Sequence, residues 1–170
     1  MAALLSPSSP DRPWAAASTH VLECRRAASP TERRTHLDIR HAVFVTEQSL
    51  FDVHDLDEFD DHPDVQHVVG YVDDVPAGCV RLFPVDSVEP GERLWKGDRL
   101  AVLDEHRHTG LAGSLVRHAV ASAGGCGGDR MIAWIQLSNV TIFRHLGWVT
   151  VGEPELYVDQ PHQQMSIGLR

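Results

Sequence analysis

Residues 99–113, RLAVLDEHRHTGLAG, combine residue types that could hold a phosphate group. An apolar run rich in strand formers leads through a polar turn into a start of helix that is rich in glycine and alanine. The first backbone N–H groups of a helix have no intrahelical partner, and the helix dipole is positive there. Small side chains let a diphosphate approach these amides. The segment therefore predicts a phosphate-binding loop, to which Arg107 would add a guanidinium.

Two common phosphate loops do not match this segment. The Walker loop requires Lys and then Ser or Thr after its last glycine, whereas Gly113 is followed by Ser114 and Leu115. The dinucleotide fingerprint requires three spaced glycines and a downstream acid, and the segment does not fit that pattern either. The chemistry predicted is thus phosphate binding by a different motif.

Arg107–Ala112, RHTGLA, resembles the R/Q-x-x-G-x-G/A acetyl-CoA loop of the GNAT N-acetyltransferase superfamily. Leu100–Val102 is similar to the "LAV" strand end before that loop, Leu146–Trp148 to the later "LGF" or "LGW" block, and Pro161–Met165 to the closing "PHxxM" strand. Arg40–Gln48 is similar to the "RxxVFxxEQ" helix of the branch that holds the ElaA-like and nitrogen-starvation N-acetyltransferases. More distantly, that branch includes the acyl-homoserine-lactone synthases.

The resemblance implies that acetyl-CoA is the acyl-donor substrate. A backbone N–H of Leu100–Val102 would polarise the thioester carbonyl, and amides of His108–Gly113 would hold the diphosphate. The resemblance and the loop chemistry together give the predicted cofactor-binding residues: Leu100, Ala101, Val102, Arg107, His108, Thr109, Gly110, Leu111, Ala112, Gly113, Asn139 and Phe143.

Two of these residues carry alternatives. Many family members place a Tyr that protonates the departing thiolate four residues before the glycine of the "LGF" block, but this chain has Phe143 there. Phenylalanine cannot donate a proton, so either another donor or water serves, and Phe143 is a packed aromatic residue. Asn139 resembles the Asn that bonds the pantetheine arm in relatives, or it caps the last helix.

The acceptor side offers four candidate residues. Glu47 is the candidate base or amine-orienting carboxylate, with a solvated last-turn residue as the alternative. His67 could act as a base near neutral pH, or it is a half-buried strand residue. Arg40 and Arg81 are cations at positions of an apolar pattern and require carboxylate partners. Those partners are either Glu47 or the acidic segment, which is structural, or a carboxylate of an amino-acid-like substrate.

Residues 52–64 hold seven acids and are predicted to form a loop or short helix over the surface: Asp52, Asp55, Asp57, Glu58, Asp60, Asp61 and Asp64. The run lacks the spacing and glycine of a calcium loop. It is interpreted as a solvated face, with attraction of a cationic amine as the functional alternative. No metal site is predicted.

The pattern of apolar residues predicts the elements that position these candidates. Ser29-Pro30-Thr31-Glu32 combines a capping box with a Pro at the first helical position, and the helix is expected to run to about residue 48. A second long helix follows the phosphate loop and ends in the glycine-rich stretch 124–128. Strands are expected at 19–25, 65–72, 77–85, 94–103 and 131–136, a short helix at 140–146, and a hairpin from residue 148.

This order predicts an α/β (α+β) fold, a mixed sheet flanked by helices. The resemblance implies the GNAT fold, with a mostly antiparallel central sheet and a splay between the fourth and fifth strands. In that fold the pantetheine arm of the donor lies in the splay, pairing with strand backbone as an added strand would.

The composition favours one domain and excludes several function classes. The chain has 170 residues, of which 42% are hydrophobic, and we expect a flexible leader at 1–17 and a single domain at 18–170. A net charge of −9 argues against nucleic acid or anionic membranes as partners and favours a cationic substrate. Three scattered cysteines and no transmembrane-length apolar run favour a reducing cytoplasm. A homodimer is left open.

The function predicted is transfer of acetyl from acetyl-CoA to a primary amine of a small metabolite, by direct attack in a ternary complex. Two alternatives remain. One is an acyl-CoA-dependent enzyme related to the acyl-homoserine-lactone synthases, which would need a wide apolar tunnel. The other is a non-catalytic acetyl-CoA-binding module, suggested by Phe143 at the Tyr position.

Overall fold

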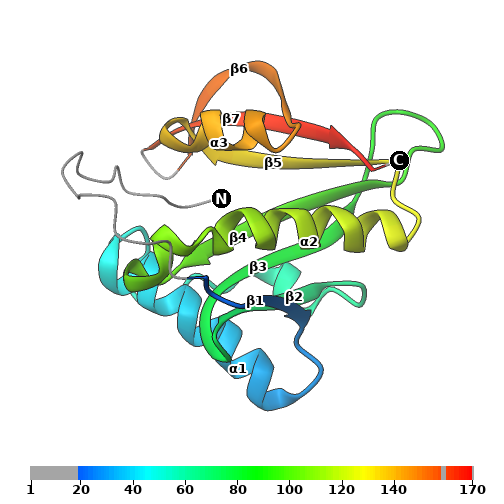
Figure 1. The fold of residues 1–170 in the computed structure, drawn as a ribbon. Helices are drawn as coiled ribbons and strands as arrows, with labels where there is room; N and C mark the ends of the chain where they lie inside the picture. Colours follow the sequence, from blue (N-terminus) through cyan, green and yellow to red (C-terminus); the bar gives the residue numbers. More distant parts are fainter. Residues whose placement is uncertain (1–18, 158–159, 170) are drawn as a thin grey trace.

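The computed structural model describes residues 19–157 and 160–169. The predicted leader 1–17 lies outside the described residues. A seven-stranded sheet in the order β1-β2-β3-β4-β5-β7-β6 forms the centre of the molecule (Figure 1). Its strands are β1 (Leu22–Arg26), β2 (Gln66–Val72), β3 (Val75–Val85), β4 (Leu94–Val102), β5 (Arg130–Gln136), β6 (Val149–Tyr157) and β7 (Gln160–Gly168). No helix of the described part is long and apolar enough to cross a membrane.

All neighbouring strands are antiparallel except β4 and β5, which are parallel. This confirms the predicted fold class. The predicted strands lie within a few residues of the observed ones, and the short helix appears as α3 (Val140–His145) after the turn η4 (Leu137–Asn139). It lies beside β5 and β7 (Figure 1).

The first helix begins as its capping signals predict. In α1 (Pro30–Arg40), the Ser29 hydroxyl accepts a hydrogen bond from the Glu32 N–H at 3.2 Å, and the Glu32 carboxylate accepts one from the Ala28 N–H at 2.9 Å. The helix does not stay α-helical to its end. It widens into the π-helix η1 (His41–Glu47), a form that is common at functional sites.

The two long helices cover opposite faces of the sheet. Alternate strand residues point to opposite faces, so Val68 packs in the core under α2 (Leu111–Gly125), whereas Val69 packs in the smaller core under α1. The larger core also contains the aromatic pair Phe143 and Trp148, whose ring centroids are 5.3 Å apart. The sheet is therefore buried on both faces where β2, β3 and β4 run.

Strands β4 and β5 separate after a short stretch of pairing. Only Leu94–Lys96 pairs with β5, at Arg130–Ile132, and the two strands diverge from there (Figure 1). Just beyond, two residues of β4, Arg99 and Leu100, lie opposite the single Val80 of β3. This bulge holds Arg99 at φ +51° and bends the strand. The splay predicted between the fourth and fifth strands is thus present.

Candidate active site

The gap between β4 and β5 forms a cleft with an almost wholly apolar wall. The space between its walls, counted together with open solvent, is about 280 Å³, and we call this feature the splay cleft. It is lined by Val80, Gly97, Asp98, Leu100, Val116, Ala119, Met131, Ala133, Phe143 and Trp148. Side chains from β4, β5, α2 and the segment around α3 therefore meet where the sheet is open.

One residue of the cleft wall carries a buried polar group without a hydrogen-bond partner in the described part of the chain. Trp148 is 3% exposed, and its indole N–H has no hydrogen-bond acceptor among the described residues. A buried donor without an acceptor is costly, so each such group in a folded protein needs an explanation. An amide or carbonyl oxygen of a bound pantetheine arm would supply the missing acceptor. The residues present therefore fit a narrow, mostly apolar ligand with a carbonyl group.

The predicted phosphate loop lies at the open end of the splay cleft. The turn η3 (Asp104–Thr109) leads to Gly110, which caps α2 at φ +85°, a conformation that favours glycine. The Thr109 hydroxyl accepts a hydrogen bond from the Leu111 N–H at 3.3 Å. The following amides, those of Ala112 and Gly113, belong to the first helical turn and point out of the helix. This end can hold an anion.

Arg107 does not present its guanidinium to that end. Its Nε donates to the Val102 carbonyl at 3.1 Å, and its two terminal nitrogens contact Asp104 at 3.0 Å and Glu47 at 2.6 Å. The contribution of this guanidinium to phosphate binding stays a prediction, and in the structure both of its terminal nitrogens contact carboxylates. Its charge is already met by two carboxylates, and the side chain ties η3 to β4 and to η1.

Glu47 lies at the edge of the site and remains accessible. It is the last residue of η1, and about a third of its side chain is exposed. Among the residues that the structure describes, Glu47 forms an ion pair with Arg107 alone, so the alternative in which it pairs with Arg40 is not formed. The Glu47–Arg107 pair instead joins the end of the first helix to the phosphate loop.

Arg40 is fully buried and is satisfied by the acidic segment. Its guanidinium contacts Asp55 at 2.8 Å and Asp60 at 2.5 Å. The interpretation of residues 52–64 as a solvated face is wrong at these two positions, because both aspartates are 4% exposed. The contacts of Arg40 match the structural alternative, because all three of its guanidinium nitrogens donate hydrogen bonds to Asp55 or Asp60.

Arg81 has the same arrangement on the neighbouring strand. Its guanidinium contacts Asp57 at 2.6 Å, Asp98 at 2.7 Å and Asp60 at 3.0 Å. Arg99, which sequence reasoning did not single out, contacts Asp55 and Asp57, each at 3.0 Å. We call these three arginines and four aspartates the charge cluster: Arg40, Arg81, Arg99, Asp55, Asp57, Asp60 and Asp98.

The charge cluster includes the β4 bulge, and the pKa values of Asp57, Asp60 and Asp98 are lowered within it. Burial by itself would raise the pKa of Asp98, but the hydrogen bond from Arg81 and the charges of Arg81 and Arg99 hold it well below its usual range. The pKa of Asp60 is lowered in the same way, against burial, by hydrogen bonds from His67 and Arg40. The cluster thus fastens the acidic segment to the bulge that opens the splay cleft.

His67 belongs to this cluster's surroundings and does not line the splay cleft. It is buried, its Nε2 lies 3.2 Å from Asp60, and its ring meets that of His36 edge-on at 4.8 Å. His36 is itself buried, with Nδ1 3.0 Å from the Val68 carbonyl oxygen. These contacts favour the alternative in which His67 is a buried strand residue, and its role as a base stays a prediction.

The remaining predicted residues lie near the cleft wall. Phe143 lines the splay cleft and packs against Trp148, as the packing interpretation expects. Asn139 is buried directly before α3, and its side chain makes no capping hydrogen bond to that helix. Within the described part, no group of three or more His, Cys, Asp or Glu is placed to hold a metal ion.

Sequence reasoning missed the roles of Trp148, Met131 and Gly97 in the cleft. Trp148 was used only to match the "LGW" block, although a buried Trp requires an acceptor for its N–H and could have been singled out for that reason. Gly97 and Met131 have no sequence signal of their own, because their contact depends on the register between β4 and β5.

Comparison with known proteins decides the family. Residues 35–148 match the family model described as "Acetyltransferase (GNAT) family". The chain belongs to the GNAT family of acetyltransferases. A Bacillus subtilis (strain 168) protein named as an acetyltransferase is 27% identical over 148 residues, which are 85% of this chain and 95% of that protein. This GNAT chain is therefore an N-acetyltransferase enzyme.

Solved structures show the same GNAT fold. Escherichia coli ElaA superposes with a TM-score of 0.70 at 21% identity, over 86% of this chain and 98% of ElaA. BjaI, a CoA-dependent acyl-homoserine lactone synthase, superposes with a TM-score of 0.69 at 19% identity, over 89% of this chain and 84% of BjaI. The likeness to the ElaA branch is thus consistent with the fold as well as with the motifs.

Proposed function

We propose that this GNAT enzyme transfers the acetyl group of acetyl-CoA to the primary amine of a small metabolite by direct attack in a ternary complex. The observation that carries the proposal is the splay cleft, which opens at the helix start formed by Gly110–Gly113 and holds the unpartnered Trp148 N–H. The helix start suits the diphosphate of the donor, and the Trp148 N–H suits an oxygen of its amide-containing pantetheine arm.

The reaction forms one C–N bond and breaks the C–S bond of the thioester. The attacking amine must be neutral, and it loses a proton as the C–N bond forms. A backbone N–H of Leu100–Val102 would donate a hydrogen bond to the thioester oxygen as negative charge develops there. Phe143 has no proton to give, so the departing thiolate takes its proton from water or from another donor.

Glu47 is the residue proposed to orient the amine and to accept its proton. It is accessible, it lies at the end of η1, and Arg107 holds its carboxylate in one place at 2.6 Å. Arg40, Arg81 and His67 are not proposed as substrate-binding or catalytic groups, because the charge cluster occupies all three. The acceptor is therefore recognised as an amine, without an arginine from this cluster.

The cysteines support direct attack over a covalent acetyl-enzyme. Burial, with a smaller effect of Glu23, raises the pKa of Cys24 to about 11, and burial raises that of Cys79 to about 12. Neither thiol is a ready nucleophile. Cys126 follows the far end of α2, about 22 Å along a helix of fifteen residues from the phosphate loop. The free thiols also fit the reducing cytoplasm that we propose as its location.

A donor with a longer acyl chain is a second candidate, since the wall of the splay cleft is apolar and BjaI shares the fold. The experiment that separates these functions measures free thiol released from acetyl-CoA by the purified enzyme across a panel of small amines, polyamines and amino acids. The proposal expects release with at least one amine, together with the N-acetylated product. Acetyl-CoA binding without release for any amine would favour a non-catalytic module.

A further inference from the structure

We infer that Met131 closes the inner end of the splay cleft and so sets the longest acyl group that the enzyme accepts. The inference rests on the proposed function, because it assigns the cleft to the donor. It adds a residue that determines specificity and is not among the predicted site residues.

Met131 lies where the two strands begin to part. It pairs with Trp95 across the parallel ladder, one residue before the last pair, Lys96 with Ile132. Its side chain reaches along β4 toward the cleft. A Cβ built on Gly97 would lie 2.7 Å from the Met131 methyl carbon, too close for two carbon atoms. The absence of a side chain at Gly97 therefore makes room for this methyl group.

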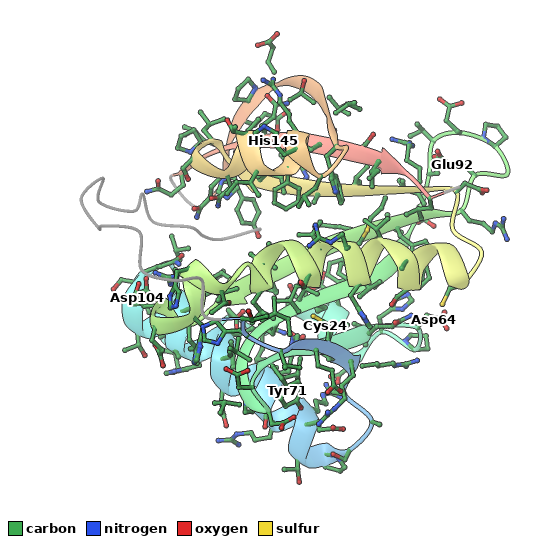
Figure 2. All side chains as sticks on the ribbon, viewed as in Figure 1. Cys24, Asp64, Tyr71, Glu92, Asp104 and His145 are labelled. Carbon is green, nitrogen blue, oxygen red and sulfur yellow. The ribbon has the colours of Figure 1, made fainter. Side chains whose placement is uncertain are left out.

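The position of Met131 is the closed end of the cleft, opposite the phosphate loop. Asp104, in the turn between β4 and α2, and Glu92, just before β4, lie at opposite ends of the molecule (Figure 2). A donor whose diphosphate lies at the Asp104 end would extend its acyl group toward the Glu92 end. Met131 is the residue that it would meet where β4 and β5 come together.

The surroundings of Met131 would leave room if its side chain were shortened. Gly97, Ala119 and Ala133 line the same cleft, and none of them has a side chain longer than a methyl group. A methionine is flexible, but it is also the longest apolar group on this part of the wall. Shortening it should therefore extend an apolar channel, and adding a methyl group at Gly97 should shorten the channel by pushing the Met131 side chain into it.

The test compares the affinities of a series of acyl-CoA donors, measured by calorimetry without any amine. The series is acetyl-, butyryl-, hexanoyl- and octanoyl-CoA. For Met131→Ala, we expect the affinity for hexanoyl-CoA relative to acetyl-CoA to rise at least tenfold over the wild type. For Gly97→Ala, we expect the affinity for butyryl-CoA relative to acetyl-CoA to fall, and the double variant should recover it.

Met165→Ala is the matched control. Met165 is as deeply buried as Met131, on the adjacent strand β7, but it does not line the splay cleft. It should lose similar stability without changing the order of donor affinities. The inference is overturned if Met131→Ala leaves the affinity for hexanoyl-CoA relative to acetyl-CoA unchanged, or if Met165→Ala changes that ratio equally. In either case, the proposed function still stands as long as the enzyme binds acetyl-CoA. If the wild type binds none of these donors, the role of Met131 and the proposed function are both overturned.

Discussion

At the scale of single residues, the charge cluster explains how so many charged groups are tolerated inside a small protein. Each of its three arginines contacts at least two aspartates within 3.0 Å. A buried ion pair offsets its desolvation only while both partners are present, and removing one leaves the other charged and buried. The cluster should therefore be sensitive to any loss of charge.

Arg40→Gln tests this sensitivity. The change leaves Asp55 and Asp60 without their main cation, so we expect the free energy of unfolding to fall by about 3–5 kcal/mol in urea titrations. The control Arg34→Gln removes an exposed pair with Asp38 on the same helix and should cost less than about 0.5 kcal/mol. A stable Arg40→Gln enzyme with a raised KM for the amine would instead assign Arg40 to the substrate.

His36 should make the protein less stable in mild acid. Burial, followed by the charges of His67 and Arg40, lowers its pKa from 6.5 to about 3. The unfolded chain therefore takes up a proton at His36 below about pH 6.5 that the folded chain does not take up until about pH 3. This contribution to stability is complete above pH 6.5 and is lost as the pH falls toward 3.

The variant His36→Gln isolates this contribution. Between about pH 6 and about pH 4, the free energy of unfolding should fall less steeply than in the wild type, by up to about 1.4 kcal/mol per pH unit for one proton. His145→Gln, an exposed histidine of α3, should leave the slope as it is. Equal slopes in the wild type and His36→Gln would show that His36 does not titrate as its burial requires.

At the scale of the elements, a substitution at the start of α2 should change ligand binding without lowering stability. An acidic side chain in the first turn of a helix is compatible with the dipole, but it repels a diphosphate. Gly113→Glu should therefore keep or slightly raise the melting temperature while weakening acetyl-CoA binding by at least about a hundredfold. Gly113→Gln has the same size without the charge and should bind much better than Gly113→Glu. Equal affinity in both variants would contradict the phosphate assignment.

The π-helix η1 ends in the proposed acceptor residue, and Glu47→Gln tests that role. Gln can still accept a hydrogen bond from Arg107, so we expect the acetyl-CoA affinity and the melting temperature to stay near those of the wild type. The kcat/KM for the amine should fall by about ten- to a thousandfold, the scale for a positioned acid or base. Normal kinetics would remove Glu47 from the site.

The helices and strands could be predicted because their sequence signals are local. The site could be predicted only in part, because several of its contacts join residues that are distant in sequence. The capping of α1 at Ser29 and the αL start of α2 at Gly110 follow from residues within one turn. The partners of Arg40 and Arg81 lie 15 to 24 residues away in sequence, on a segment whose burial no local pattern shows. The contact between Gly97 and Met131 depends on strand register, which the sequence does not state.

At the scale of the whole molecule, the charge cluster and the splay cleft are linked through the bulge in β4. The cluster fastens the acidic segment to β4 at Asp98 and Arg99, and the same bulge turns β4 away from β5. Helix α2 then packs across the larger core and brings its first turn to the open end. The proposed donor site is therefore the opening in the sheet rather than any single side chain.

Backbone amide exchange with and without acetyl-CoA tests that claim most directly. We expect acetyl-CoA to slow exchange at Leu100–Val102, at Gly110–Gly113 and in the second half of β5. Exchange in β1 and at the far end of α2 near Cys126 should be unchanged. If acetyl-CoA binds without slowing exchange at Leu100–Val102 and Gly110–Gly113, or slows it only near Cys126, the opening in the sheet is not the donor site.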